Sequence, residues 1–311
     1  MKKVVVTMLA MLFLAGNAMA ANYPDRTMTV VIPFGAGGET DIVARILAQA
    51  IEEEAGVTVA PKNIVGAAGM NGCKAVVSAK PDGYTVGVIP SAPLVMHPHM
   101  RKLPYELSAF ELIGRVTYDP YLVLVHKDEA WTDLNAMIGD MKANPGKYHW
   151  GSSGTGSVPY FAGKNLFESF GVDAKHVPFK GDAGALQAIA AKRVKLYTTT
   201  AGVLAKHDLK ALAILAPEKS EKLPEIPAVS EFGQDVFYSQ FLTLVAPKGM
   251  PEDVIKRLEE LVAKAVASEK FVSDIQKLGM TPAYLSAAAT KEFVEGEWAR
   301  NEVSIKKMME K

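Results

Sequence analysis

The stretch 29–51 constrains the fold of this 311-residue chain most strongly. A run of apolar, mostly β-branched residues at 29–32 leads into a glycine-rich turn at 35–38, and from Ile42 on apolar residues recur at the spacing of one helix face. This pattern predicts a strand, a turn and a helix. The unpaired N–H groups at such a helix start attract anions. A plain turn whose glycines only permit tight packing explains the pattern equally well.

The second half of the chain repeats this arrangement. Residues 148–150 predict a short strand, residues 151–157 read Gly-Ser-Ser-Gly-Thr-Gly-Ser, and a helical pattern begins near Tyr160. A third strand-to-helix turn follows at 176–184. Short strands that alternate with helices predict parallel α/β sheets, and a chain of this length favours two domains over one.

The N-terminus has the form of a secretory signal peptide. Lys2 and Lys3 precede an apolar run at 4–15, and Ala18-Met19-Ala20 has the small residues of a cleavage site. We therefore expect residues 1–20 to be removed and the mature chain to act in the periplasm. Cleavage removes two of the 34 Lys and Arg and none of the 34 Asp and Glu, which leaves 32 against 34 and a formal charge of −2. This balance gives no basic excess for binding nucleic acid.

Residues for catalysis or metal binding are sparse. Cys73 is the single cysteine, so no internal disulfide can form. The pair His97 and His99 lacks a nearby third ligand, and we expect both to be exposed loop residues, with no metal and no cofactor. Ser153 can be paired on paper with His176 or His149. However, no serine has glycine at both −2 and +2, and no acid is placed to orient either histidine. The sequence therefore predicts a binding protein and no enzyme.

Several motifs occur in the order and spacing of a known family. They include VVIPFGAGGETDIVARILA, the turn NIVGAAG, PDGYT, ANPGKYHWGSSGTGS, HVPFKG and KLPEIPAVSEFG. Together they cover essentially the whole mature chain, and their conjunction is far more specific than any single motif. The chain resembles the periplasmic solute-binding receptors of tripartite tricarboxylate transporters, the Bug or TctC-like proteins.

This resemblance implies a type II periplasmic-binding-protein fold, with two α/β domains and a ligand cleft between them. The expected domains are 21–120 plus 246–311, and 121–245. The implied function is to capture a small organic acid, a carboxylate, and to deliver it to the membrane permease of the transporter. We expect a monomer. The alternatives are a ligand-sensing co-receptor of a signalling system and a periplasmic hydrolase.

In the family, the carboxylate is held by backbone N–H groups, hydroxyls and bridging waters from the first glycine turn and its counterpart in the second domain. Glu39 departs from the family pattern, so either its side chain points to solvent or the ligand carries an amino or other donor group there. Mapped onto this chain by motif, the residues that supply the N–H groups and hydroxyls are Phe34, Gly35, Ala36, Gly37, Gly38, Thr40, Asp41, Ser152, Ser153, Thr155, Gly156 and Ser157. Two other connections can face a ligand. They are the loop predicted at 90–93, with Ser91, and the third strand-to-helix turn, with Lys180, Gly181 and Asp182.

Overall fold

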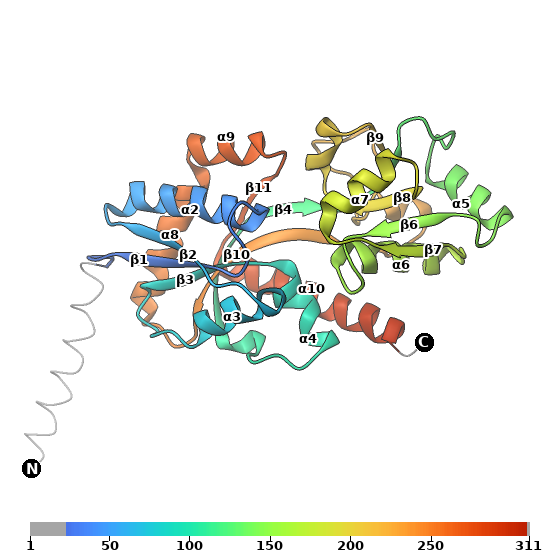
Figure 1. Ribbon diagram of the computed structural model, residues 1–311. Helices are drawn as coiled ribbons and strands as arrows, with labels where there is room; N and C mark the ends of the chain where they lie inside the picture. Colours follow the sequence, from blue (N-terminus) through green and yellow to red (C-terminus); the bar gives the residue numbers. More distant parts are fainter. Residues whose placement is uncertain (1–22, 310–311) are drawn as a thin grey trace, which may run out of the picture. The chain divides into compact units, whose positions relative to one another are not determined.

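The computed structural model describes residues 23–309 (Figure 1), so the predicted signal peptide lies outside the described residues. Contacts between Cα atoms divide the chain into two units. Unit 1 comprises the described residues up to Thr117 together with Phe241–Lys277 and Pro282–Lys306. Unit 2 comprises Tyr118–Gln240, Leu278–Thr281 and the chain from Lys307 on.

Unit 1 is built on a mixed six-stranded sheet in the order β11-β4-β10-β3-β1-β2. Strand β1 is parallel to both of its neighbours, whereas β10 is antiparallel to β3 and β11 is antiparallel to β4. The strands are β1 (Met28–Ile32), β2 (Val59–Asn63), β3 (Thr85–Pro90), β4 (Phe110–Pro120), β10 (Ser239–Pro247) and β11 (Pro282–Leu285).

Helices cover both faces of this sheet. Helix α2 packs against α8 and α9, and α3 lies on the opposite face (Figure 1). The periodic apolar residues of α2, such as Val43, Leu47 and Ile51, are fully buried, as the helical spacing requires. The helical segments of this unit are α2 (Glu39–Ala55), η1 (Ala67–Gly69), α3 (Met70–Val77), η2 (Ala92–Met96), α4 (His97–Met100), η3 (Leu107–Ala109), α8 (Glu252–Ala267), α9 (Glu269–Lys277) and α10 (Ala287–Met309), whose last residues belong to unit 2.

Unit 2 contains a five-stranded sheet in the order β7-β6-β8-β5-β9. Strand β6 is parallel to β7 and β8, and β5 is antiparallel to β8 and β9. Helices α6 and α7 cover opposite faces (Figure 1). The elements are β5 (Leu122–His126), α5 (Leu134–Ala143), β6 (His149–Ser152), α6 (Val158–Phe170), β7 (Lys175–Pro178), α7 (Gly181–Ala190), β8 (Leu196–Thr199), η4 (Ala201–Lys206), β9 (Leu209–Ile214) and η5 (Val229–Phe232).

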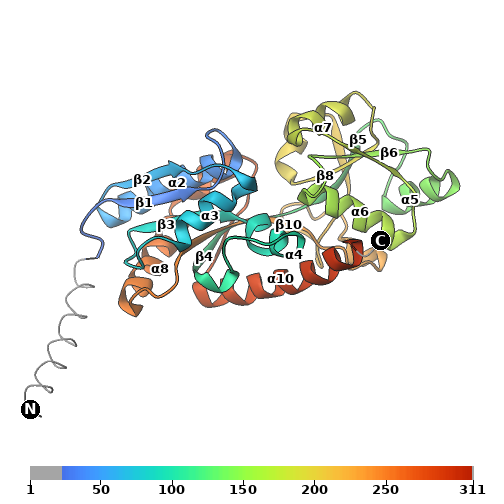
Figure 2. The same ribbon diagram turned by 60° about the horizontal axis from the view of Figure 1, so that its bottom comes forward.

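The segment after β3 differs from its prediction. Residues 90–93 were expected to form a loop and His97 to be exposed, and both expectations are wrong. The chain enters the π-helical turn η2 directly and continues into α4, where the His97 side chain is buried and the ring of His99 packs edge-on against Trp298 of α10 at 4.5 Å between centroids (Figure 2). Prolines in the first helical turn allow this start, because their missing N–H has no helical partner to lose.

Candidate functional site

The carboxyl ends of β1, β2 and β3 meet at one edge of the unit 1 sheet, because these three strands are parallel. Strand β1 lies between the other two, and its flanking helices α2 and α3 cover opposite faces, so the chain changes direction across the sheet at β1. Ligands of open α/β sheets bind at such a switch point. The predicted turn from Phe34 to Gly38 lies there.

Three connections converge at this edge. A Cβ atom placed on Gly69 would lie 3.1 Å from the Phe34 ring and 3.1 Å from Pro93, so the loops that follow β1, β2 and β3 are in contact. The loop after β2 also holds Ala67 and Ala68 in the left-handed region, with φ of 48° and 53°. Such backbone strain in residues other than glycine clusters at functional sites. The sequence did not predict it, since alanine gives no signal for a positive φ.

The carboxylate of Asp41 holds the first turn in place. The N–H of Gly37 donates to Oδ2 at 2.9 Å, Asn63 Nδ2 donates to Oδ1 at 2.8 Å, and Arg45 Nε lies 3.0 Å from both oxygens. Asn63 also donates to the carbonyl of Phe34 at 2.9 Å. The bond from Arg45, together with those from Asn63 and Gly37, lowers the pKa of Asp41 to about 2. Asp41 is therefore ionised at any physiological pH, and its buried carboxylate holds the turn in place through these hydrogen bonds.

This arrangement leaves the start of α2 open. Its N-cap residue, Gly38, has no side chain to accept a hydrogen bond, and the first helical bond joins the N–H of Ile42 to the carbonyl of Gly38 at 3.0 Å. Among the described residues, none accepts a hydrogen bond from the N–H of Thr40 or Asp41. The residues from Gly35 to Glu39 are exposed. An exposed turn beside an uncapped helix start is a site that favours an anion.

Ser91 is placed differently from the other predicted residues of unit 1. It follows β3 at the same edge of the sheet, but its side chain is only 2 % exposed and it begins the helical turn η2. Its hydroxyl lies beneath the surface, where it can support the edge.

Unit 2 repeats this topology. Strand β6 lies between β7 and β8 and is parallel to both, so the turn 153–157 and the connection to α7 meet at one edge. Two backbone bonds join these segments: the N–H of Phe179 donates to Ser152 at 2.9 Å and that of Gly181 donates to Ser153 at 3.3 Å. The second group of predicted residues, Ser152–Ser157 and Lys180–Asp182, is therefore brought together within this unit.

Two serines of this turn serve the fold. Ser157 caps α6, since its Oγ accepts from the N–H of Tyr160 at 3.3 Å. Ser152 is fully buried, and its Oγ lies 2.7 Å from His176 Nε2 and also bonds to the N–H and carbonyl of Gly154. Burial lowers the pKa of His176, and no carboxylate among the described side chains orients its ring. A buried hydroxyl next to an unoriented histidine supports the turn and is poorly placed as a nucleophile.

Tyr197 was missed by the sequence reasoning as a site residue. It is fully buried on β8, yet its hydroxyl donates to Asp182 in the first turn of α7 and is hydrogen-bonded to Ser153. Lys180, at the N-cap of α7, is exposed.

Arg45 was also missed as a residue that supports the turn of unit 1. The sequence could have indicated it, because Arg45 lies four residues after Asp41 on the same helix face.

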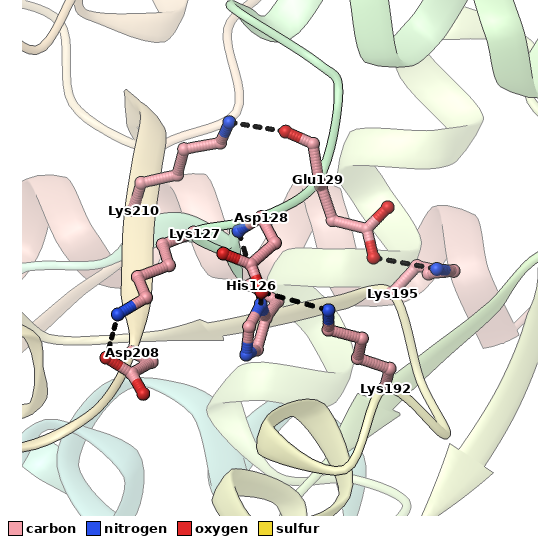
Figure 3. Close-up of polar contacts among 8 residues, drawn as sticks. All are labelled: His126, Lys127, Asp128, Glu129, Lys192, Lys195, Asp208 and Lys210. Carbon is pink, nitrogen blue, oxygen red and sulfur yellow. Dashed lines mark hydrogen bonds and ion pairs between the residues drawn. The ribbon is translucent and has the colours of Figure 1, made fainter.

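A further polar cluster of unit 2 lies at the opposite edge of its sheet, because β5 runs antiparallel to β8 (Figure 3). Each lysine in it has an oxygen partner. The pairs are Lys127 with Asp208 at 2.6 Å, Lys192 with Asp128 at 3.0 Å, Lys195 with Glu129 at 2.7 Å, and Lys210 with the Glu129 carbonyl at 2.6 Å. Exposed pairs of this kind stabilise a protein little.

The described part of the chain contains no group of three or more histidine, cysteine, aspartate or glutamate side chains arranged to hold a metal ion. Within the same residues, no helix combines the length and the apolar character needed to cross a bilayer.

Two α/β units, each with a glycine turn and a helix start at the carboxyl edge of its sheet, define the class of solute-binding proteins. Residues 43–309 match the family model described as tripartite tricarboxylate transporter family receptor, and the chain belongs to this family. It is 29% identical to the protein BugT of Bordetella pertussis over 92% of this chain and 90% of that protein.

Solved structures agree with this assignment. A TctC solute-binding protein from Polaromonas superposes with a TM-score of 0.83 at 26% identity, covering 92% of this chain and 99% of the other. MatC from Rhodopseudomonas palustris, solved with bound malate, gives a TM-score of 0.74 at 27% identity over 91% of this chain and 100% of MatC. The predicted family and α/β fold class are thereby confirmed.

Proposed function

We propose that this chain is a periplasmic receptor that binds a small organic acid and delivers it to the permease of a tripartite transporter. Membership of the receptor family supports this role, and so does the malate bound to the similar protein MatC. The signal-peptide pattern of residues 1–20 supports the location. The partners are the acid and the membrane permease, and the receptor acts as a monomer.

The observation that carries the proposal is the uncapped start of α2. Its N–H groups point to an edge where three connections converge, and Asp41, Asn63 and Arg45 fix the turn before any ligand arrives. A carboxylate bound there gains hydrogen bonds and the favourable end of the helix dipole. A turn that is already ordered loses little entropy on binding. The hydroxyls and N–H groups of the turn 153–157 in unit 2 are the second set of groups that we propose for ligand binding.

The test is a thermal-shift screen of the mature protein, refolded to remove bound ligand, against mono-, di- and tricarboxylates, amino acids and aromatic acids. A ligand at one hundred times its Kd stabilises the fold by about 2.7 kcal/mol, which raises the melting temperature visibly. A rise for one class of acid names the cargo. If a folded protein responds to none of these acids, the proposal is wrong.

Gly37 offers a variant with a matched control. Gly37 (φ of 80°) and Gly56 (φ of 70°) both lie in the left-handed region with open space around them, at opposite ends of α2. Valine at either position costs about 1–2 kcal/mol in backbone strain. We expect Gly37→Val to abolish ligand-induced stabilisation and Gly56→Val to retain it. Equal responses in the two variants would argue against the helix start as the binding site.

A further inference from the structure

A buried tyrosine, Tyr105, joins two of the three connections that meet at the carboxyl edge of the unit 1 sheet. It lies between α4 and η3, and its hydroxyl donates to the carbonyl of Pro93 in the first turn of η2 at 3.0 Å. The same hydroxyl is hydrogen-bonded to the thiol of Cys73 on α3. The side chains of Tyr105 and Cys73 are 9 % and 0 % exposed, so both bonds are shielded from water.

The carbonyl of Pro93 needs this donor because the helix supplies none at the usual positions. A carbonyl accepts from the N–H five residues ahead in a π-helical turn, and from the N–H four residues ahead in an α-helical turn. Five residues after Pro93 is Pro98, which has no N–H. Four residues after it is His97, whose N–H donates to the carbonyl of Ala92. The Tyr105 hydroxyl replaces the missing helical bond, since a buried carbonyl without a donor is costly.

Pro93 in turn contacts the segment that leads into the first glycine turn. A Cβ atom on Gly69 would lie 3.1 Å from the ring of Pro93 and 3.1 Å from the ring of Phe34, so both rings pack against Gly69. Gly69 is also the N-cap residue of α3, and Cys73 lies one helical turn further on. The contacts therefore form a closed circuit that starts and ends at Tyr105 and includes all three connections.

Building on the proposed function, we propose that Tyr105 is a positioning residue, which fixes the glycine turn at 34–38 without touching the ligand. Groups that bind a ligand need supporting residues whose own positions are locked. Without the hydroxyl, the Pro93 carbonyl loses its donor, and the packing of Phe34 against Gly69 is free to shift. The glycine turn would then lose more entropy when a ligand orders it, and the affinity would fall.

A buried hydroxyl that donates to a carbonyl also stabilises a fold wherever it lies, and Tyr23 offers the matched control for that role. Its side chain is 5 % exposed, and its hydroxyl donates to the carbonyl of Gly83 at 2.7 Å. Gly83 lies just before β3, at the opposite edge of the same sheet. Tyr23→Phe therefore removes a bond of the same kind at a distance from the glycine turn.

The first measurement is hydrogen exchange, read by mass spectrometry, on the refolded mature protein without ligand. Peptides that cover 34–42 and 64–71 report on the edge, and both segments contain hydrogen-bonded amides. In Tyr105→Phe we expect these peptides to exchange faster by about threefold or more, because the edge opens locally. Tyr23→Phe should leave their rates unchanged. Unaltered rates in Tyr105→Phe, or an equal increase in both variants, would overturn the positioning role.

The second measurement is isothermal titration of the unaltered protein and both variants with malate, glutarate, citrate, aspartate and benzoate, with the folds checked by circular dichroism. For each acid that binds the unaltered protein, Tyr105→Phe should raise the Kd about fivefold, the factor that corresponds to one typical hydrogen bond. Tyr23→Phe should leave the Kd unchanged. A role in stability alone lowers the melting temperature of both variants and changes neither Kd, because titration is done well below melting.

The outcomes distinguish this inference from the function on which it rests. An unchanged Kd in Tyr105→Phe overturns the positioning role and leaves the carboxylate receptor intact. If the unaltered protein binds none of these acids, nor any acid of the thermal-shift screen, the proposed function is wrong. Hydrogen exchange then decides by itself whether Tyr105 fixes this edge of the sheet.

Discussion

His97 shows how a single buried side chain sets a pH limit on stability. Its ring is 7 % exposed, and no described group hydrogen-bonds to its Nδ1. Burial, assisted by the charge of Arg101, lowers the pKa of His97 to about 4. In the unfolded chain His97 therefore takes up a proton near pH 6.5, whereas in the folded protein it does so only near pH 4.

We expect the free energy of unfolding to fall as the pH decreases from about 6.5 to 4, by up to about 3 kcal/mol from His97 alone. His97→Gln should flatten this part of the profile in urea titrations at several pH values, whereas His149→Gln, at an exposed position, should not. If the slopes of the two variants coincide, His97 is not the group responsible.

The comparison must be made between variants, because Asp119 acts in the opposite direction. This carboxyl group is 4 % exposed on β4, and burial raises its pKa to about 6 despite hydrogen bonds from Thr281. Its stabilising contribution is present below about pH 4 and is lost as the pH rises through about 6. The profile of the unaltered protein is therefore a sum in which the two residues partly cancel.

At the scale of the element, helices α2 and α6 differ in how the unpaired N–H groups of their first turns are capped. Gly38 leaves the N–H groups of α2 to a ligand, whereas Ser157 caps α6 with its own hydroxyl. We expect Ser157→Ala to lower the free energy of unfolding by about 1 kcal/mol in denaturant titrations, as the loss of an N-cap does. Thr155→Ala, in the same turn but exposed, serves as the control and should change it little. Equal losses would show that the Ser157 bond to Tyr160 contributes nothing to stability.

The glycine turns and their helices could be predicted from the sequence because their signals are local. The change from a strand pattern to a helical pattern around Gly35–Gly38 lies within twenty residues, and the structure places β1 and α2 on either side of that turn. The burial of His97 could not be predicted. The sequence gives no local signal for the π-helical turn η2 that leads into it. Nor does it indicate that the neighbouring His99 ring packs against Trp298 of α10, about two hundred residues further along the chain.

The same contrast holds for the site. The resemblance located both turns, but nothing in the sequence distinguished residues that face a ligand from residues that hold the turn, as Asp41 and Ser152 do. That distinction depends on partners such as Asn63 and His176, which lie more than twenty residues away. Direct contact of each predicted residue with the ligand stays a prediction.

At the scale of the whole molecule, the chain passes between the two units more than once. Strand β4 leaves unit 1 after Thr117, β10 returns to it at Phe241, and the short segment Leu278–Thr281 belongs to unit 2. These boundaries come from contacts within the folded chain. The domain bounds 21–120 plus 246–311 and 121–245 stay a prediction.

The position of β10 has a consequence for the order of folding. This strand lies between β3 and β4 in the middle of the unit 1 sheet, but it follows them in the sequence by more than a hundred residues. Most of unit 2, by contrast, is one continuous segment, and contacts close in sequence form faster. Hydrogen exchange pulsed during refolding should therefore protect the amides of β5 and β8 before those of β3. During synthesis from the N-terminus, the strands of unit 1 up to β4 are made before unit 2. The sheet of unit 1 is therefore completed last, and β3 and β4 stay partly unpaired until β10 has been made.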